Sequence, residues 1–222
     1  MSKELLRQRM IGILRSMPCR RIDFRVGGFR ADPAGYEKIA RLLGRRGPIK
    51  VDIEPNDEGI AFYDSKTNTV SFPEPGYGRS VGERALIVHE LTHALEDERR
   101  RTMGELELEV AAYVAGSLYA KYARQQSPGV SLSWPSRGAV ARRSGRAQGL
   151  ILVDADGTPI PTREQQTERL KAAVHAAADS LAGHPGAALS APYYQAVASA
   201  VRDHEVYEGA TDKKTKTFDG IR

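Results

Sequence analysis

The sequence predicts an α+β fold, in which a small mixed sheet packs against two paired helices and a further pair of helices follows. Two long segments, 81–100 and 103–123, carry apolar residues at helical spacing. Several short segments between residues 21 and 72 alternate apolar and polar residues, as half-buried strands do. The chain has 222 residues, 41% of them hydrophobic, so it can bury one sizeable core.

The N-terminal elements follow from local patterns. Apolar residues at helical spacing predict a helix over residues 3–16. Alternation of isoleucine, phenylalanine and valine with charged residues predicts a strand over 21–26. Asp32 followed by Pro33 is an N-cap with proline at the first helical position, so a second helix begins there and ends near Leu43.

The segment that follows predicts strands. Residues 49–53 again alternate apolar and polar side chains. Residues 59–63 and 69–72 flank a five-residue segment whose side chains favour turns. We therefore expect a β-hairpin at the edge of the sheet.

Two long helices come next, after a loop rich in proline and glycine. Ser80 and Glu83 have the spacing of a capping box, which predicts that a helix begins at residue 81 and extends to about Arg100. The second helix runs from about residue 103 to 123. The two should be antiparallel neighbours, because so few residues connect them.

The rest of the chain is divided by composition. Residues 125–147 are rich in serine, proline, glycine and arginine, which is typical of a loop or linker. Helical patterns return at about 163–182 and 188–205. We expect a core over 1–125, a loop or linker with a small hairpin over 126–162, a helical cover over 163–208 and a flexible basic tail over 209–222.

Charge and cysteine content exclude some classes of function. The 33 basic and 28 acidic residues are spread along the chain and form no basic stripe with aromatics, so no nucleic-acid partner is expected. No apolar run is long enough to span a membrane, and the N-terminus has no apolar segment typical of a signal peptide. The single cysteine, Cys19, excludes a cysteine-based zinc site. We expect a protein that is cytoplasmic as made; export without a signal peptide is compatible with the sequence.

The residues that carry chemistry lie in the middle of the 81–100 helix, where the sequence runs His-Glu-Leu-Thr-His from His89 to His93. Histidines four residues apart turn by about 400° on a helix, so both project from one face toward a single metal ion. Glu90 can then act as general base on a water bound to that metal. The alternative, two core histidines beside a salt-bridged glutamate, would bury three polar groups at high cost unless each had a partner.

A zinc ion held by two histidines needs a third protein ligand and a fourth position open to water. The metzincin arrangement is excluded, because Arg99 stands where its third histidine would be. The next helix offers Glu105, Glu107 and Glu109, of which the first and last share a face while Glu107 points away. We favour Glu109, because the small alanines after it allow two helices to approach closely, and we keep Glu105 as the alternative.

This pattern resembles the minimal gluzincin metallopeptidases, including the ImmA/IrrE type. In that family a glutamate in an E-x-x-A pattern on the following helix completes the site, as Glu109-Val-Ala-Ala112 would here. The resemblance covers about residues 50–123 and implies a zincin-like fold with the hairpin along the active-site cleft. It implies His89, His93 and Glu109 as zinc ligands and Glu90 as general base. A minimal domain of this kind also resembles secreted bacterial effector and toxin proteases.

The expected function is hydrolysis of peptide bonds in a protein or peptide substrate, with one zinc ion. Zinc would lower the pKa of its bound water to about 7, and Glu90 would pass the proton of this water to the leaving amine. An exported effector or toxin protease and a non-catalytic, metal-stabilised binding protein stay open as alternatives.

Further residues are candidates for roles around the metal. Asp97, one turn past His93, is either a hydrogen-bond partner of a ligand or a surface charge. Tyr113 and Tyr119 fit the pattern of core residues. We expect a donor to the oxyanion in the C-terminal helices, where the candidates are Tyr193, Tyr194, His175, His184 and His204.

Overall fold

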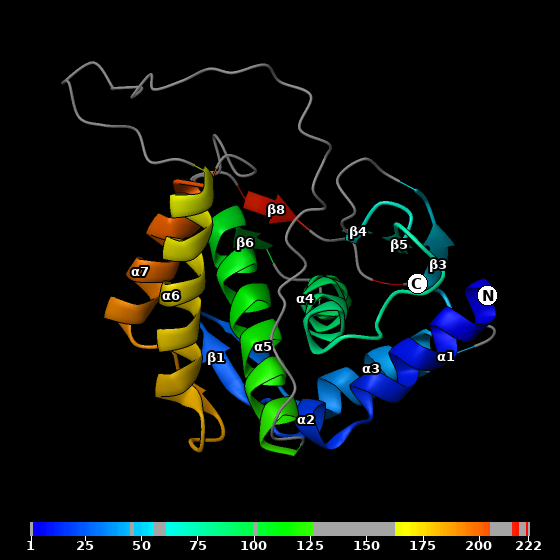
Figure 1. Cartoon of the computed structure of the whole chain (residues 1–222), viewed down its shortest axis with the longest axis horizontal. Helices are drawn as coiled ribbons and strands as arrows, with labels where there is room; N and C mark the ends of the chain where they lie inside the picture. Colours follow the sequence, from blue (N-terminus) through cyan, green and yellow to red (C-terminus); the bar gives the residue numbers. More distant parts are fainter. Residues whose placement is uncertain are drawn as a thin grey trace.

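Helices and small sheets share the molecule, which confirms the α+β class at a coarse level (Figure 1). The computed structural model describes residues 2–44, 47–55, 61–99, 102–126, 163–204, 215–217 and 221. Within these ranges, seven helices and three small sheets surround one apolar core. The predicted linker and its small hairpin lie outside the described residues.

The N-terminal helices form where capping residues place them. Helix α1 (Lys3–Leu14) begins after Ser2, and α3 (Pro33–Leu42) begins after Asp32, whose side chain accepts the Gly35 N–H at 2.7 Å. Both helices confirm the sequence prediction. A short helix, α2 (Met17–Arg20), lies between them and was not predicted.

The strands form three small sheets in place of one. Their order is β2-β1-β7, β3-β5-β4 and β6-β8. The strands are β1 (Phe24–Val26), β2 (Phe29–Ala31), β3 (Lys50–Ile53), β4 (Phe62–Asp64), β5 (Thr69–Phe72), β6 (Thr102–Gly104), β7 (Ala187–Ala188) and β8 (Thr215–Thr217). Strand β8 falls within the segment that the sequence assigned to a flexible tail.

The predicted hairpin is confirmed as β4 and β5, which pair antiparallel with Tyr63 opposite Val70. Asn68, in the turn, has a φ of 52°, a left-handed conformation that asparagine tolerates better than most residues. Strand β3 pairs parallel with β5, so this sheet is mixed, as expected, and β4 is one of its edges.

Helices α4 (Val81–Glu98) and α5 (Glu105–Gln126) lie side by side at the centre of the molecule (Figure 1). The capping box is present in α4, because the Ser80 hydroxyl accepts the Glu83 N–H and the Glu83 carboxylate accepts the Ser80 N–H. At the closest approach Gly116 faces α4, and a Cβ there would lie 2.9 Å from the carbonyl oxygen of Ala85. The small residue brings the two backbones together.

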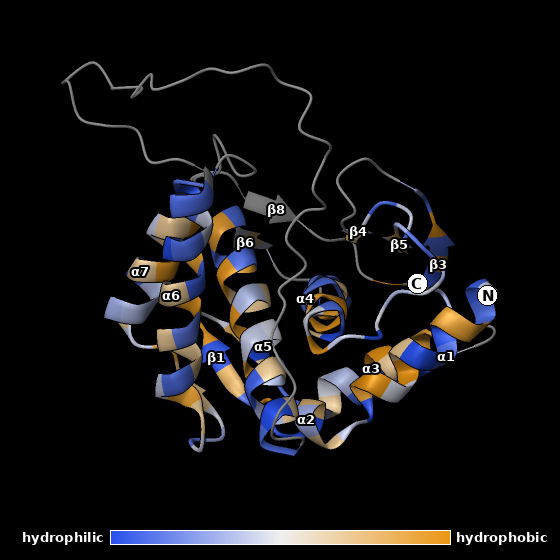
Figure 2. Cartoon of the chain, viewed as in Figure 1, coloured by the Kyte–Doolittle hydropathy of each residue, from blue (hydrophilic) through white to orange (hydrophobic). Residues whose placement is uncertain are grey.

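The two C-terminal helices, α6 (Arg163–Leu181) and α7 (Ala191–Arg202), are confirmed and pack against α5 and each other. The α6 ribbon alternates between hydrophilic and hydrophobic colours along its length in Figure 2, as expected for a helix with one covered face. Among the described residues, no helix is both long and apolar enough to cross a membrane.

Candidate metal centre

The central turns of α4 present His89, Glu90 and His93. The first two are 6% and 8% exposed, and His93 is partly buried. The helix is tied to α3 through Thr92, whose hydroxyl donates to the Val88 carbonyl and lies 2.9 Å from the Tyr36 hydroxyl of α3. The motif therefore lies on a helix that is held to α3 and packed into the core.

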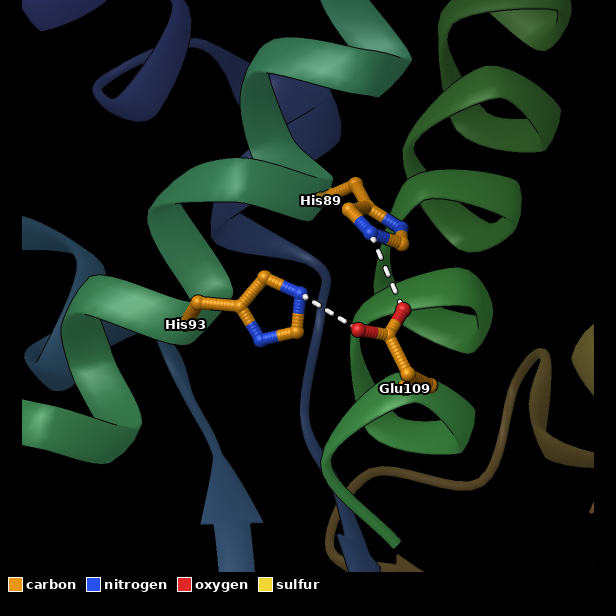
Figure 3. A group of neighbouring side chains, drawn as sticks. All are labelled: His89, His93 and Glu109. Atoms are coloured by element: carbon orange, nitrogen blue, oxygen red, sulfur yellow. Dashed lines mark ion pairs between the residues drawn. The ribbon is translucent and has the colours of Figure 1, made fainter. Parts of the chain in front are cut away.

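The first turns of α5 bring Glu109 to the two histidines. Its Oε2 lies 3.6 Å from His89 Nε2, and its Oε1 lies 3.6 Å from His93 Nε2. Figure 3 shows both rings and the carboxylate converging between the two helices. One donor atom from each residue lies within 4.8 Å of the others, so this group could hold a metal ion.

The spacing within this group suits a metal better than direct contact. Separations of 3.6 Å are too long for hydrogen bonds. They approach the distance of about 3.4 Å that separates neighbouring ligands of a tetrahedral zinc ion with bonds near 2.1 Å. Glu109 Oε2 is buried and accepts no hydrogen bond from the described residues. A cation between the three side chains would satisfy this oxygen.

The other glutamates of α5 lie elsewhere. The group that could hold a metal ion among the described residues contains Glu109 and not Glu105, which is the first residue of the helix. Glu107 points toward the β1–β2 turn, where a Cβ at Gly27 would lie 1.8 Å from its Oε1. Of the two alternatives that the sequence left open, Glu105 and Glu109, the structure places Glu109 beside the histidines.

Glu90 lies beside the group without belonging to it. Its Oε1 is 3.9 Å from His89 Nε2. If the three side chains held a metal, a carboxylate at this position could address a water bound to it and would not be needed as a ligand.

Two buried carboxylates follow the motif on α4, and both are fully enclosed, at 0% exposure. Glu96 Oε2 lies 2.9 Å from His93 Nδ1. Asp97 accepts a 2.7 Å hydrogen bond from the Tyr63 hydroxyl of β4. Of the two roles that the sequence left open for Asp97, a surface charge is wrong, because the side chain is fully buried. Of these two carboxylates, Glu96 is the one that contacts a histidine. It was not predicted as a partner of His93, and its i,i+3 spacing from His93 is the sequence signal that could have indicated the contact.

The two histidines differ in pKa. Burial lowers the pKa of His89 well below its usual range, and neighbouring His93 lowers it further. Burial also opposes protonation of His93, but the carboxylates of Glu109, Glu96 and Glu90 outweigh it and raise its pKa to about 9. A metal that bound His93 at neutral pH would therefore have to displace a proton.

Tyr113, which the sequence predicts to be a core residue, lies beside the candidate metal ligands. It follows Glu109 by one turn, is only partly buried, and packs edge-on against the His89 ring at 4.6 Å between centroids. Tyr119 is buried in the core, as expected.

The C-terminal candidates for an oxyanion donor lie in or beside the helical layer outside α5. His204 Nε2 is 3.3 Å from the Thr167 hydroxyl, and Tyr193 is exposed. Burial lowers the pKa of His175, and Arg124 of α5 lowers it further, so His175 lies close to Arg124. Arg124 and Glu109 stand at opposite ends of α5, roughly 20 Å apart at 1.5 Å per residue. His175 therefore does not reach the metal group.

Comparison with known proteins adds no relative. No protein-family model matches the chain, and no curated protein or solved structure matches it significantly. The case for a function therefore rests on the side chains themselves.

Proposed function

We propose that this protein is a zinc-dependent peptidase whose metal is bound by His89, His93 and Glu109, with Glu90 as general base. The observation that carries the proposal is the convergence of two imidazoles and one carboxylate from two neighbouring helices. It agrees with the resemblance to minimal gluzincins, which rests on the same residues.

The donor set favours zinc. Two imidazole nitrogens and one carboxylate oxygen are typical of catalytic zinc sites, which keep a fourth position for water. Sites for magnesium or calcium are built from oxygen ligands instead. A purely structural zinc site is closed by four protein ligands, whereas the group found among the described residues has three.

The proposed chemistry follows from the positions of the side chains. When bound, zinc supplies an acidified water and polarises the carbonyl of the scissile bond. Glu90, 3.9 Å from His89 Nε2, accepts the proton from the attacking water and returns it to the leaving amine. Its burial, at 8% exposure, limits exchange of that proton with bulk solvent.

The hairpin supports a peptide as substrate. Strand β4 is an edge of its sheet, so its outer backbone groups can pair with an extended peptide. The hydrogen bond from Tyr63 to Asp97 connects this strand directly to the helix of the motif. An edge strand attached to the metal-binding helix can hold a peptide in register with the metal.

The proposal is tested by metal analysis together with a cleavage screen. We expect one zinc per chain in wild type and in Glu90→Gln, and none in His93→Ala. Peptide cleavage should fall by several orders of magnitude in Glu90→Gln, since the base acts in the transition state. Glu105→Gln, a matched change at the start of α5, should retain both zinc and cleavage.

Two results would contradict the proposal. If Glu90→Gln loses zinc as fully as His93→Ala, Glu90 is a ligand and the assigned roles are wrong. If wild type binds zinc but releases no peptide products that depend on Glu90, the protein is a metal-stabilised binding protein.

A further inference from the structure

The side chain with the clearest unexplained position is Glu96. It is fully buried, at 0% exposure, in the last third of α4. An enclosed carboxylate is costly unless it accepts strong hydrogen bonds. Its Oε2 lies 2.9 Å from His93 Nδ1, which is the distance of a charge-assisted hydrogen bond.

The geometry of His93 makes this contact consequential. An imidazole that donates a proton from Nδ1 to a carboxylate keeps Nε2 free to bind a metal. Here Nε2 faces Glu109 at 3.6 Å, on the side of the ring away from Glu96. One hydrogen bond therefore sets both the tautomer of the ring and its direction.

We propose that Glu96 is the positioning residue of this metal centre. Its buried carboxylate holds His93 with Nε2 toward the metal and makes the imidazole a stronger metal ligand. The inference rests on the proposed metal site, but not on catalysis. Glu96 does not touch the metal or a substrate in this role, because it acts through His93.

The other histidine is held in a different way. His89 Nδ1 is buried and has no hydrogen-bond partner among the described residues. Its ring packs edge-on against Tyr113, at 4.6 Å between centroids. His89 is thus oriented by packing and His93 by a carboxylate. Of the two histidines, only His93 has a carboxylate hydrogen-bonded to its Nδ1 among the described residues.

The chain provides a matched control in the next residue. Asp97 is also a carboxylate at 0% exposure on the same helix, but it accepts from Tyr63 of the hairpin. Glu96→Gln and Asp97→Asn each remove one buried negative charge with almost no change in volume. A merely structural role for Glu96 predicts that both changes affect the protein alike.

The experiment measures zinc affinity by competition with a chromophoric chelator, on the full chain. We expect zinc to bind about 10- to 100-fold more weakly to Glu96→Gln than to wild type, as found when outer partners of ligand histidines are changed. Asp97→Asn should bind zinc within about threefold of wild type. In nitrogen-15 NMR of the metal-free protein, the His93 Nδ1 resonance should shift from its wild-type position in Glu96→Gln. It should stay at the wild-type position in Asp97→Asn.

Equal zinc affinities for the two variants, or an unshifted His93 resonance in Glu96→Gln, would overturn the inference. Glu96→Met serves as a second variant if Glu96→Gln folds poorly, because its unbranched side chain fills the same space without a charge. Turnover plays no part in these measurements. A protein that binds zinc without cleaving peptides would refute the proposed activity, while the comparison of affinities would still decide the role of Glu96.

Discussion

The close approach of α4 and α5 at Gly116 gives a sharp prediction for Gly116→Ala. The added Cβ would lie 2.9 Å from the Ala85 carbonyl oxygen and 3.7 Å from His89 Cβ. The first distance is too short, and its partner is backbone, so the helices must separate. Overpacking of this kind costs about 1–3 kcal/mol. Alanine recovers about 0.5–1 kcal/mol through helix propensity, which leaves a net loss of up to about 2.5 kcal/mol.

Gly12→Ala is the matched control, since Gly12 lies within α1 and a Cβ there would meet nothing within 4 Å. This variant should gain about 0.5–1 kcal/mol. Urea unfolding of the metal-free proteins measures the change in the free energy of unfolding for both variants. In thermal unfolding, a difference of 1 kcal/mol should shift the Tm by about 2–4 °C. Zinc affinity should fall in Gly116→Ala alone, because separation of the helices moves Glu109 away from the histidines. A Gly116→Ala protein as stable as Gly12→Ala would refute the close contact.

Three further predictions follow from the same two helices. Glu109→Gln should weaken zinc binding at least about tenfold and Glu105→Gln should change it little, measured by chelator competition; the reverse result would exchange their roles. Removal of zinc with a chelator should lower the Tm by about 5–10 °C from its value at a zinc concentration 100-fold above Kd, and an unchanged Tm would argue against binding to the folded state. Ser80→Ala should cost about 1 kcal/mol in urea unfolding, since its hydroxyl accepts the Glu83 N–H at 3.1 Å; no loss would show that the cap is not stabilising.

The helices and the grouping of the candidate metal ligands were predictable because their signals are local. Caps such as Ser80 and Asp32 mark helix starts in the sequence itself. The i,i+4 spacing of His89 and His93 determines their common face once the helix is known. Glu109 required one more step, the antiparallel return of α5, which the short connection supports.

The missed features depend on pairings that no local pattern encodes. Strand β7 is two residues long and pairs with β1, some 160 positions earlier, so no alternation could reveal it. Strand β8 pairs with β6 across a gap of about 110 positions in the sequence. Glu96 stands in a run of charged residues that is typical of a solvated helix face. Its burial depends on the strands and helices that enclose the end of α4.

The pairing of β1 with β7 has a consequence for the order in which the molecule is assembled. Every residue of the metal group precedes residue 127, so α4 and α5 are complete while much of the chain is still to be made. At roughly 5–20 residues per second, several seconds pass before α6, β7 and α7 leave the ribosome. During this interval the side of α5 that these helices cover, and the β1 edge that β7 occupies, face solvent. Early capture of a metal by the nascent chain would hold α4 and α5 together until their covering layer arrives.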